Sequence, residues 1–239
     1  MLKMTHLAKI YRTETVETYA LRDFSIHVRE GEFVAVTGPS GSGKTTFMTI
    51  AGLLEEFTSG EYQLDGVDVR RLNDNQRSRL RNEKIGFIFQ AFNLLADLTV
   101  EGNVEVPLRY RRLGRAERGQ RIKRALEKVG LSGRARHYPA ELSGGQQQRA
   151  AIARALAGSP RLLLADEPTG NLDTQMAHGV IQLIEDLHRD GATIVMVTHD
   201  PELAVRAQRE VHMVDGQVVD VGAPGHLDVR SQTPLKSHS

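Results

Sequence analysis

The sequence contains no cysteine among its 239 residues. Disulfide bonds, thiolate metal sites and cysteine nucleophiles are therefore excluded, and the composition fits a reducing compartment. Neither sign of charge is in excess, since 31 Lys and Arg against 30 Asp and Glu leave a formal net charge of +1. A chain with so little net charge has no overall field that draws it to nucleic acid.

Long apolar runs are also absent from the sequence. No window approaches the roughly 18 apolar residues that a membrane-spanning helix requires, and residues 1–6 do not open an apolar stretch of the signal-peptide kind. Apolar residues make up 40% of the chain and charged residues 26%, which is ordinary globular usage in a length that can bury a core. We therefore expect a soluble, intracellular globular protein.

Four short runs are apolar on both faces, as expected for parallel strands that helices cover on both sides of a sheet. They lie at residues 33–36, 85–89, 162–165 and 193–197. Asp65-Gly66 and Asp215-Gly216 each separate short apolar runs and predict two-residue hairpin turns. We therefore expect an antiparallel section beside the parallel core, which the β-rich stretch up to residue 28 could join.

Apolar residues recur at helical spacing in segments 47–54, 122–129 and 180–187. Gly130 and Gly191 follow two of these segments, where a helix would end. Strands that alternate with such helices predict an α/β fold. Residues from about 92 to 145 are expected to form a helical subdomain inserted in a single domain at 1–222, and residues 223–239 a loose tail.

A glycine-rich segment follows the first apolar run and opens a helical pattern, which is the context that a phosphate-binding loop requires. It consists of Gly38, Pro39, Ser40, Gly41, Ser42, Gly43, Lys44 and Thr45, followed by Thr46. The glycines let backbone N–H groups curl around an anion at the positive end of a helix. Lys44 would reach the β- and γ-phosphates of a nucleotide, and the Thr45 hydroxyl would bind Mg²⁺. The alternative interpretation is a flexible Gly/Ser turn.

The apolar run at 162–165 ends in two carboxylates, Asp166 and Glu167. Asp166 would hold Mg²⁺ through its water shell, and Glu167 would polarise the attacking water as general base beside the γ-phosphate. An acidic pair is also common where a strand leaves a core, so this interpretation depends on the phosphate loop upstream.

Leu142-Ser143-Gly144-Gly145-Gln146 has the form of a capping box, in which Ser143 caps a helix and Gln146 reaches back. The same geometry aims backbone N–H groups and a hydroxyl at any anion near the helix start. The segment resembles the LSGGQ signature of ABC-type ATPases. This resemblance covers about residues 2–222 and implies the ABC ATPase fold, a P-loop NTPase core with a mainly parallel sheet, an antiparallel β subdomain and an inserted α-helical subdomain.

The resemblance assigns roles to further residues. Gln90 matches the Q-loop glutamine, which contacts Mg²⁺ and communicates with the membrane subunit, and Asp173 matches the D-loop aspartate, which reaches across a dimer. His199 matches the switch histidine that contacts the γ-phosphate. Tyr11 is expected to stack on the adenine, although Tyr19 lies nearby and a surface tyrosine in a hairpin is the alternative.

The resemblance also implies a mode of action. In this family each ATP lies between the Lys44 loop of one chain and the Ser143-Gly144-Gly145 segment of another, so a two-fold homodimer is expected. ATP contacts both chains only in the closed state, and its hydrolysis reopens the dimer. The protein is accordingly expected in the cytoplasm on the inner face of the cell membrane, attached to a separately encoded permease, with no nucleic acid as partner.

Segments 89–95, 101–108 and 166–173 look like the MacB/LolD/FtsE group, which serves lipoprotein release, efflux and the control of cell-wall hydrolases. Glu55 stands near the position of a common proline and departs from the group's pattern, which leaves the cargo open. An importer ATPase for amino acids or similar small solutes shares every catalytic motif and is the alternative. A soluble ABC ATPase acting on DNA or ribosomes fits poorly, because the stretch from Lys44 to Asp166 shows no sustained heptads.

Residues 109–124 hold eight basic residues and one acid, Glu117. One interpretation is a solvated helix-and-loop face. The other is contact with the anionic leaflet of a membrane, where each basic residue adds about 1 kcal/mol. A nucleic-acid role ranks lower, because no aromatic residue besides Tyr110 is interleaved with the charges.

Overall fold

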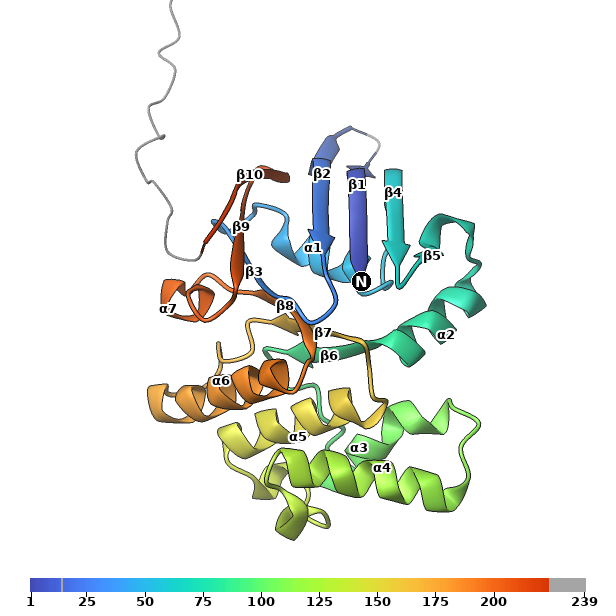
Figure 1. Cartoon of the computed structure of the whole chain (residues 1–239), viewed down its shortest axis with the longest axis vertical. Coiled ribbons are helices and arrows are strands. Elements are labelled where there is room, and N and C mark those ends of the chain that lie inside the picture. The colour runs from blue at the N-terminus through green and yellow to red at the C-terminus, as the bar shows by residue number, and fades with distance from the viewer. Residues whose placement is uncertain (14, 224–239) are drawn as a thin grey trace, which may run out of the picture.

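Two β-sheets form the framework of the described part of the chain, residues 1–13 and 15–223 of the computed structural model (Figure 1). The larger sheet has six strands in the order β10-β9-β3-β8-β7-β6, and the smaller has four in the order β2-β1-β4-β5. The strands are β1 (Leu2–Arg12), β2 (Glu17–Val28), β3 (Phe33–Thr37), β4 (Ser59–Leu64), β5 (Val67–Asp68), β6 (Ile85–Phe89), β7 (Leu162–Asp166), β8 (Thr193–Val197), β9 (Arg209–Val214) and β10 (Gln217–Gly222). The predicted loose tail lies outside the described residues, except for Ala223.

The four buried runs predicted as strands form four consecutive strands of the larger sheet, β3-β8-β7-β6, and all of them are parallel. Strand β3 pairs with β8 and β9, while β7 pairs with β8 and β6. Every residue of β3 and β8 is buried, because helices or the smaller sheet cover both faces. The carboxyl ends of parallel strands meet at one edge of a sheet, so the loops that follow β3, β7 and β8 are brought together there.

Both predicted Asp-Gly turns are present. Asp65 and Gly66 join β4 to β5 with φ angles of 51° and 78°, and Asp215 and Gly216 join β9 to β10 with φ angles of 49° and 78°. Two successive residues with positive φ match the twist of the strands that a tight hairpin connects. Strand β10 is therefore the antiparallel edge of the larger sheet, and β1, β2 and β4 pair antiparallel in the smaller one.

Helices cover the larger sheet on both faces. They are α1 (Lys44–Ala51), α2 (Asp74–Lys84), α3 (Val100–Arg109), α4 (Arg115–Lys128), α5 (Gly144–Ala157), α6 (Thr174–Arg189) and α7 (Pro201–Ala204), with short 3-10 turns η1 (Val69–Arg71), η2 (Ser132–Arg134) and η3 (Pro139–Glu141). Figure 1 shows α1 with the smaller sheet on one side of the larger sheet and α3 to α6 on the other. The predicted α/β architecture is confirmed.

Alternate residues of the central strands supply the two cores. Val34 and Val36 pack with α1 and the smaller sheet, whereas Phe33 and Ala35 pack with α3 to α6. Burying one large apolar side chain contributes about 1.5–3 kcal/mol, so both layers are held to the same sheet. Within residues 92–145, helices α3 and α4 pack against each other and against α5.

Helix ends agree with the sequence at two positions and differ at one. Gly130 and Gly191 follow α4 and α6 with φ angles of 72° and 94°, as expected for glycines that end helices. The helix predicted for residues 47–54 continues beyond the observed one, because α1 ends at Ala51 and Gly52 follows as its cap. Leu54 lies beyond the helix and is half exposed.

Candidate active site

The glycine-rich segment forms a loop between the end of β3 and the start of α1. Gly38 and Gly43 have φ angles of 144° and 98°, which residues with a side chain rarely adopt. A Cβ atom on Gly38 would lie 2.1 Å from the Met213 carbonyl oxygen, and one on Gly43 would lie 2.4 Å from the Ala20 carbonyl oxygen. Glycine is therefore required at both positions, because strands β9 and β2 leave room for backbone alone.

The β9–β10 hairpin supports this loop from the side. The Gly216 N–H donates to the Ser42 carbonyl oxygen at 3.0 Å, and the Gly216 carbonyl accepts from the Arg22 N–H at 2.8 Å. The loop is thus fixed by neighbouring backbone at the N-terminus of α1, where backbone N–H groups attract an anion.

Lys44 lies over the loop that precedes it. Its ammonium group donates to the carbonyl oxygens of Gly38 and Pro39, each at 2.7 Å. Burial lowers the pKa of Lys44, while the negative charges of Glu167 and Asp166 oppose that shift. The electrostatic coupling joins the phosphate loop to the end of β7 in one site. On binding, phosphate oxygens would replace the two carbonyl acceptors.

Asp166 ends β7 and is partly buried. Burial raises the pKa of its carboxyl, the charge of Glu167 raises it further, and Lys44 opposes the shift. A carboxylate in this setting is stabilised by a nearby cation. The carboxylate of Asp166, the Thr45 hydroxyl and the Gln90 amide oxygen are the hard donors that Mg²⁺ prefers, so this set fits the ion chemically. In the described residues, no three His, Asp or Glu side chains gather where they could hold a metal ion by themselves.

Glu167 and His199 are in direct contact across neighbouring strands. The Glu167 Oε1 atom lies 2.7 Å from Nδ1 of His199 and also accepts from the His199 N–H at 3.0 Å. The other oxygen, Oε2, accepts a longer bond of 3.4 Å from the Thr198 hydroxyl. Glu167 has a φ angle of 45°, unusual for a residue with a side chain, and its N–H donates to the Val197 carbonyl at 2.9 Å. The predicted general base and the predicted switch histidine are thus brought together.

Gln90 lies just after β6 and is joined to the loop that follows β7. Its side-chain amide donates to Asn171 Oδ1 at 3.3 Å, and the Asn171 amide donates back to the Gln90 carbonyl at 3.1 Å. These two bonds connect the predicted Q-loop glutamine to the segment that contains Asp173.

The predicted capping box is present at the start of α5. Ser143 Oγ accepts from the Gln146 N–H at 3.4 Å, and the Ser143 N–H donates to Gln146 Oε1 at 3.1 Å. Asp173 caps α6 in a similar way, through a bond of 2.8 Å from the Met176 N–H. The two helix starts are in contact, since the Gly145 N–H points to Met176 Sδ at 3.2 Å.

Tyr11 projects from β1 toward α1 and is 40% exposed. Its hydroxyl donates to Glu55 Oε2 at 2.8 Å, and Lys9 Nζ lies 4.8 Å from the centre of its ring. Burial and the interaction with Glu55 raise the pKa of Tyr11. Tyr11 is the residue predicted to stack on adenine. Glu55, which departs from the family pattern, therefore orients this side chain. Tyr19 is similarly exposed, with the Arg22 guanidinium 5.1 Å from its ring centre.

The candidate residues thus fall into two groups, one that includes the phosphate loop and one that includes the capped turn at 143–146. Lys44, Asp166, Glu167 and His199 are linked by contacts or by charge, and Gln90 adjoins them through Asn171. Among the described residues, no hydrogen bond or ion pair joins the turn at 143–146 to the phosphate loop. Sequence reasoning missed Thr198 and the buried Gln148. The first precedes His199 directly, but the second has no signal beyond a run of three glutamines.

The basic segment at 109–124 is largely neutralised or turned inward. Arg109 and Arg118 pair with Glu105, and Arg121 pairs with Glu117. The Arg111 guanidinium donates to the backbone carbonyls of Asn82 and Gly158. These contacts favour the interpretation of this segment as an ordinary solvated face.

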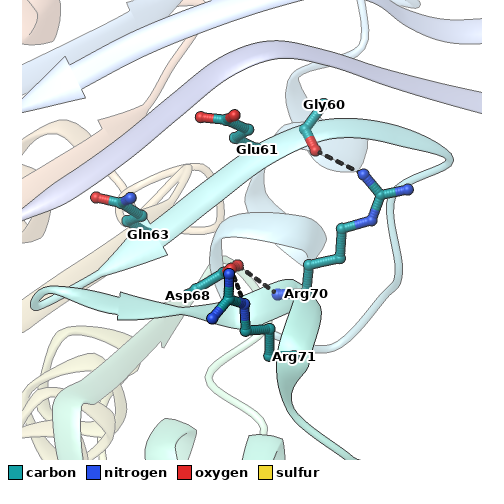
Figure 2. A pocket seen from close by; sticks show the side chains of 6 residues that line it. All are labelled: Gly60, Glu61, Gln63, Asp68, Arg70 and Arg71. Atoms are coloured by element: carbon teal, nitrogen blue, oxygen red, sulfur yellow. Dashed lines mark hydrogen bonds and ion pairs between the residues drawn. The ribbon is translucent and has the colours of Figure 1, made fainter.

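A surface hollow lies on the smaller sheet and is lined by residues of β4, β5 and η1 (Figure 2). Some of its polar groups bond to one another: Arg71 pairs with Asp68 at 3.0 Å, and Asp68 Oδ1 accepts from the Arg70 N–H at 3.1 Å. Arg70 also reaches the Gly60 carbonyl at 3.4 Å. Asp68, Arg70 and Arg71 thus make their contacts within the hollow.

Within the described ranges, no helix has both the length and the apolar character that crossing a bilayer demands.

Comparison with known proteins gives consistent matches. The sequence model of the family described as "ABC transporter" matches residues 21–170, which include the phosphate loop, Gln90, the capped turn and the acidic pair. YvrO of Bacillus subtilis, an ABC transporter ATP-binding protein, is 48% identical over 219 residues, covering 92% of this chain and 96% of its own. The macrolide export ATP-binding/permease protein MacB of Pectobacterium atrosepticum is 45% identical over 92% of this chain, but the chain spans only 34% of MacB.

Solved structures agree with the sequence comparison. The ATP-binding cassette MJ0796, dimeric in a post-hydrolysis state with ADP and Pi, superposes with a TM-score of 0.84 at 41% identity. The match covers 93% of this chain and 98% of the cassette. A second dimeric structure of the same cassette gives a TM-score of 0.85 at 42% identity.

Proposed function

This chain belongs to the ABC transporter family as an ATP-binding subunit with ATPase activity, and from that premise we propose that two copies of it close around two molecules of ATP to drive a membrane permease of the MacB type. The contact between Glu167 and His199 carries this proposal, because it supports Glu167 as a general base that the neighbouring strand orients, and the charge of Glu167 acts on Lys44 of the phosphate loop. The site lies at the carboxyl edge of the parallel sheet, where α/β proteins bind ligands.

The geometry assigns different tasks to the two oxygens of Glu167. Oε1 is occupied by both the ring and the backbone N–H of His199, whereas Oε2 accepts only the long bond from Thr198. Oε2 is therefore the oxygen that takes the proton from an attacking water. As the water oxygen bonds to the γ-phosphorus, the bond from phosphorus to the bridging oxygen breaks, and ADP leaves with that electron pair. Lys44 stabilises the charge on the phosphates.

Mg²⁺ is the expected cofactor of this reaction, and it supplies positive charge to the β- and γ-phosphates. Thr45, Gln90 and Asp166 are the residues that would hold it. The raised pKa of Asp166 supports this assignment, because its causes are burial and the negative charge of Glu167, and a bound cation would offset both. The phosphate loop at 38–46, with Tyr11 for the base, would hold the rest of the nucleotide.

The second copy is proposed because Ser143, Gly144, Gly145 and Gln146 lie apart from the phosphate loop of their own chain. The cassette MJ0796, 41% identical and similar in fold, is dimeric with ADP and Pi. An isologous pair related by a two-fold axis would bring the capped turn of each copy, and Asp173 beside it, to the nucleotide of the other.

The permease partner is supported by the relationship to MacB, whose name joins an ATP-binding part to a permease. Work on a membrane protein would place the chain at the cytoplasmic face of the membrane. A small-solute importer is the less favoured alternative. MacB of Pectobacterium atrosepticum, 45% identical over 92% of this chain, is named as an export protein, which favours an exporter over an importer.

The proposal is tested with Glu167→Gln, which should bind ATP but hydrolyse it slowly. The variant, loaded with Mg-ATP, is captured from detergent-solubilised membranes of the source cell, and copurifying proteins are identified. Lys44→Ala, which should not bind ATP, is the matched control. A permease of few spans with a large extracytoplasmic domain is expected. A many-spanning importer permease would favour the alternative, and ribosomal or DNA-bound partners alone would exclude the transport function.

A further inference from the structure

The side chain of Gln148 is completely buried in α5, one turn after the capped start of that helix. Its amide nitrogen donates to two backbone carbonyls on different elements. One is the Phe89 carbonyl at 3.2 Å, at the end of β6, and the other is the Pro168 carbonyl at 2.5 Å, after the acidic pair. Both amide protons are therefore used to bind two loops of the candidate active site to one helix.

The Gln148 amide can be oriented in only one way. Its Oε1 atom has no hydrogen-bond partner among the described residues, although it is buried. A flipped amide would place this oxygen against two carbonyl oxygens and leave two buried acceptors unsatisfied, which costs about 1–3 kcal/mol for each group. The arrangement thus depends on a side-chain donor of this length, which an apolar or acidic side chain does not supply.

The two carbonyls flank the residues proposed for catalysis. Phe89 directly precedes Gln90, and Pro168 directly follows Glu167. Glu167 has a left-handed backbone with a φ angle of 45°, which costs free energy for a residue with a side chain. Such a conformation persists only where its surroundings fix it. The Glu167 N–H is held by Val197 on one side, and Gln148 holds the next peptide on the other.

A second side chain of α5 strengthens the connection to the loop after β6. The Arg154 guanidinium donates to the carbonyls of Phe92, at 2.8 Å, and of Asn93. Both residues have positive φ angles, of 56° and 52°. Helix α5 therefore holds this loop at two separate points, and Gln148 extends the connection to Pro168.

We propose that Gln148 is a positioning residue of the ATPase: through the Phe89 and Pro168 carbonyls it fixes Gln90 and Glu167 to the helix that begins with Ser143-Gly144-Gly145. This inference rests on the proposed function and deepens it. When a nucleotide approaches and the capped turn at the start of α5 moves, Gln148 then transmits this movement to Glu167, whose carboxylate activates water. Among the described residues, no hydrogen bond or ion pair joins Gln148 to the phosphate loop, so ATP binding by the separate chain does not depend on it.

The test compares Gln148→Met with Gln147→Met. Gln147 is the adjacent residue of α5, and its amide also donates to a backbone carbonyl, that of Leu142 at 3.1 Å, outside the proposed catalytic residues. Methionine preserves length and removes the donors. We expect Gln148→Met to lower kcat by about tenfold to a hundredfold, because a small displacement of a catalytic group has effects of this size. The Kd for ATP should stay within about twofold, since the sites share no contact.

Gln147→Met should keep both kcat and Kd within about twofold of the wild type. A Gln148→Met protein that keeps its kcat would overturn the proposal, as would equal losses of kcat in both variants. Failure of the proposed function is recognised separately, because Glu167→Gln, which lacks the proposed general base, would then hydrolyse ATP as fast as the wild type.

A measurement on the unaltered chain covers the case in which Gln148→Met does not fold. Nitrogen-15 NMR of the glutamine side chains should show that both amide protons of Gln148 exchange slowly with solvent, and that those of the exposed Gln217 exchange rapidly. ATP binding should shift the Gln148 signals. Rapid exchange at Gln148 would contradict the two bonds on which the inference depends.

Discussion

The Oε1 atom of Glu167 meets His199 twice, at 2.7 Å from the ring nitrogen Nδ1 and at 3.0 Å from the backbone N–H. Two residues that are 32 positions apart in the chain thus form a single unit, because β7 and β8 are adjacent parallel strands that end at the same level. His199 fixes the rotamer of the carboxylate and leaves Oε2 directed elsewhere.

His199→Ala should therefore lower kcat strongly while ATP binding is retained. The side chain of Glu167 would lose the contact that orients it, and a positioned acid–base group contributes about 10²–10⁴-fold. Steady-state ATPase assays and fluorescent-nucleotide binding measure the two effects. His178→Ala on the exposed surface of α6 is the control and should behave as the wild type. Equal activities of the two variants would remove His199 from the proposed site.

Lys44→Met should lose nucleotide binding without a loss of fold stability. Burial lowers the pKa of Lys44, so the charged form that predominates at neutral pH is less stable in the folded chain than in water. Methionine removes that cost. Thermal denaturation without nucleotide should give an equal or higher Tm, whereas the increase in Tm that Mg-ATP causes in the wild type should disappear. A lower Tm would show that the bonds to Gly38 and Pro39 outweigh the cost of burial.

Asp166→Asn should raise the free energy of unfolding at neutral pH. Because burial and the charge of Glu167 raise the pKa of Asp166 in the folded chain, the folded state binds more protons between the unfolded and folded pKa values. Stability is lost as pH rises through that window, and the loss is complete above the folded pKa. The gain in the free energy of unfolding that Asp166→Asn gives over the wild type should therefore vanish below about pH 4. Denaturant titrations at several pH values check this.

The same Asp166→Asn variant tests the metal assignment. Addition of Mg²⁺ together with ATP should stabilise the wild type more than ATP with EDTA does, and this difference should be much smaller in the variant. Equal effects of Mg²⁺ on the two proteins would mean that Asp166 does not contribute to holding the ion.

Tyr11→Ala should raise the KM for ATP by about tenfold, since stacking of a base on an aromatic ring contributes about 1–3 kcal/mol. Tyr19→Ala is the matched control on the adjoining strand and should leave KM unchanged. The reverse result would transfer the stacking role to Tyr19. Glu55→Gln, which keeps the size of the residue that bonds to Tyr11, should have an intermediate effect.

Substitution of Arg112, Arg115 and Arg124 by glutamine should not change binding to vesicles of phosphatidylglycerol and phosphatidylcholine. These are the exposed arginines of the basic segment for which the described structure shows no ion pair, so they remain available for a lipid surface. A clear loss of sedimentation with the vesicles at low salt would restore the membrane-contact interpretation.

Much of this architecture follows from the sequence because its signals are local. The buried central strands are continuous apolar runs, and both hairpins carry Asp-Gly. The phosphate loop, the acidic pair and the capping box are contiguous motifs whose geometry a few neighbouring residues determine. The positions of these elements in the fold agree with the sequence for that reason.

Other features depend on contacts between distant segments and could not be predicted. Gln148 resembles Gln146 and Gln147 in sequence, and only the packing of α5 against β6 and β7 distinguishes it. The inward turn of Arg111 and the pairing of Arg118 with Glu105 likewise follow from tertiary structure, whereas a count of basic residues suggests a uniformly charged face. Glu55 departs from the group's pattern in sequence, and its bonds to Lys9, Tyr11 and Thr49 are evident only from the structure.

The bond from Gly216 to Ser42 offers a way to watch the phosphate loop directly. Asp215, its neighbour, is exposed at the tip of the hairpin. Since the sequence has no cysteine, Asp215→Cys would create a single thiol in the protein. An environment-sensitive fluorophore attached there would be one residue away from a direct bond to the loop. Nucleotide arrival, closure and release could then be followed in real time without labelling either the nucleotide or the proposed catalytic residues.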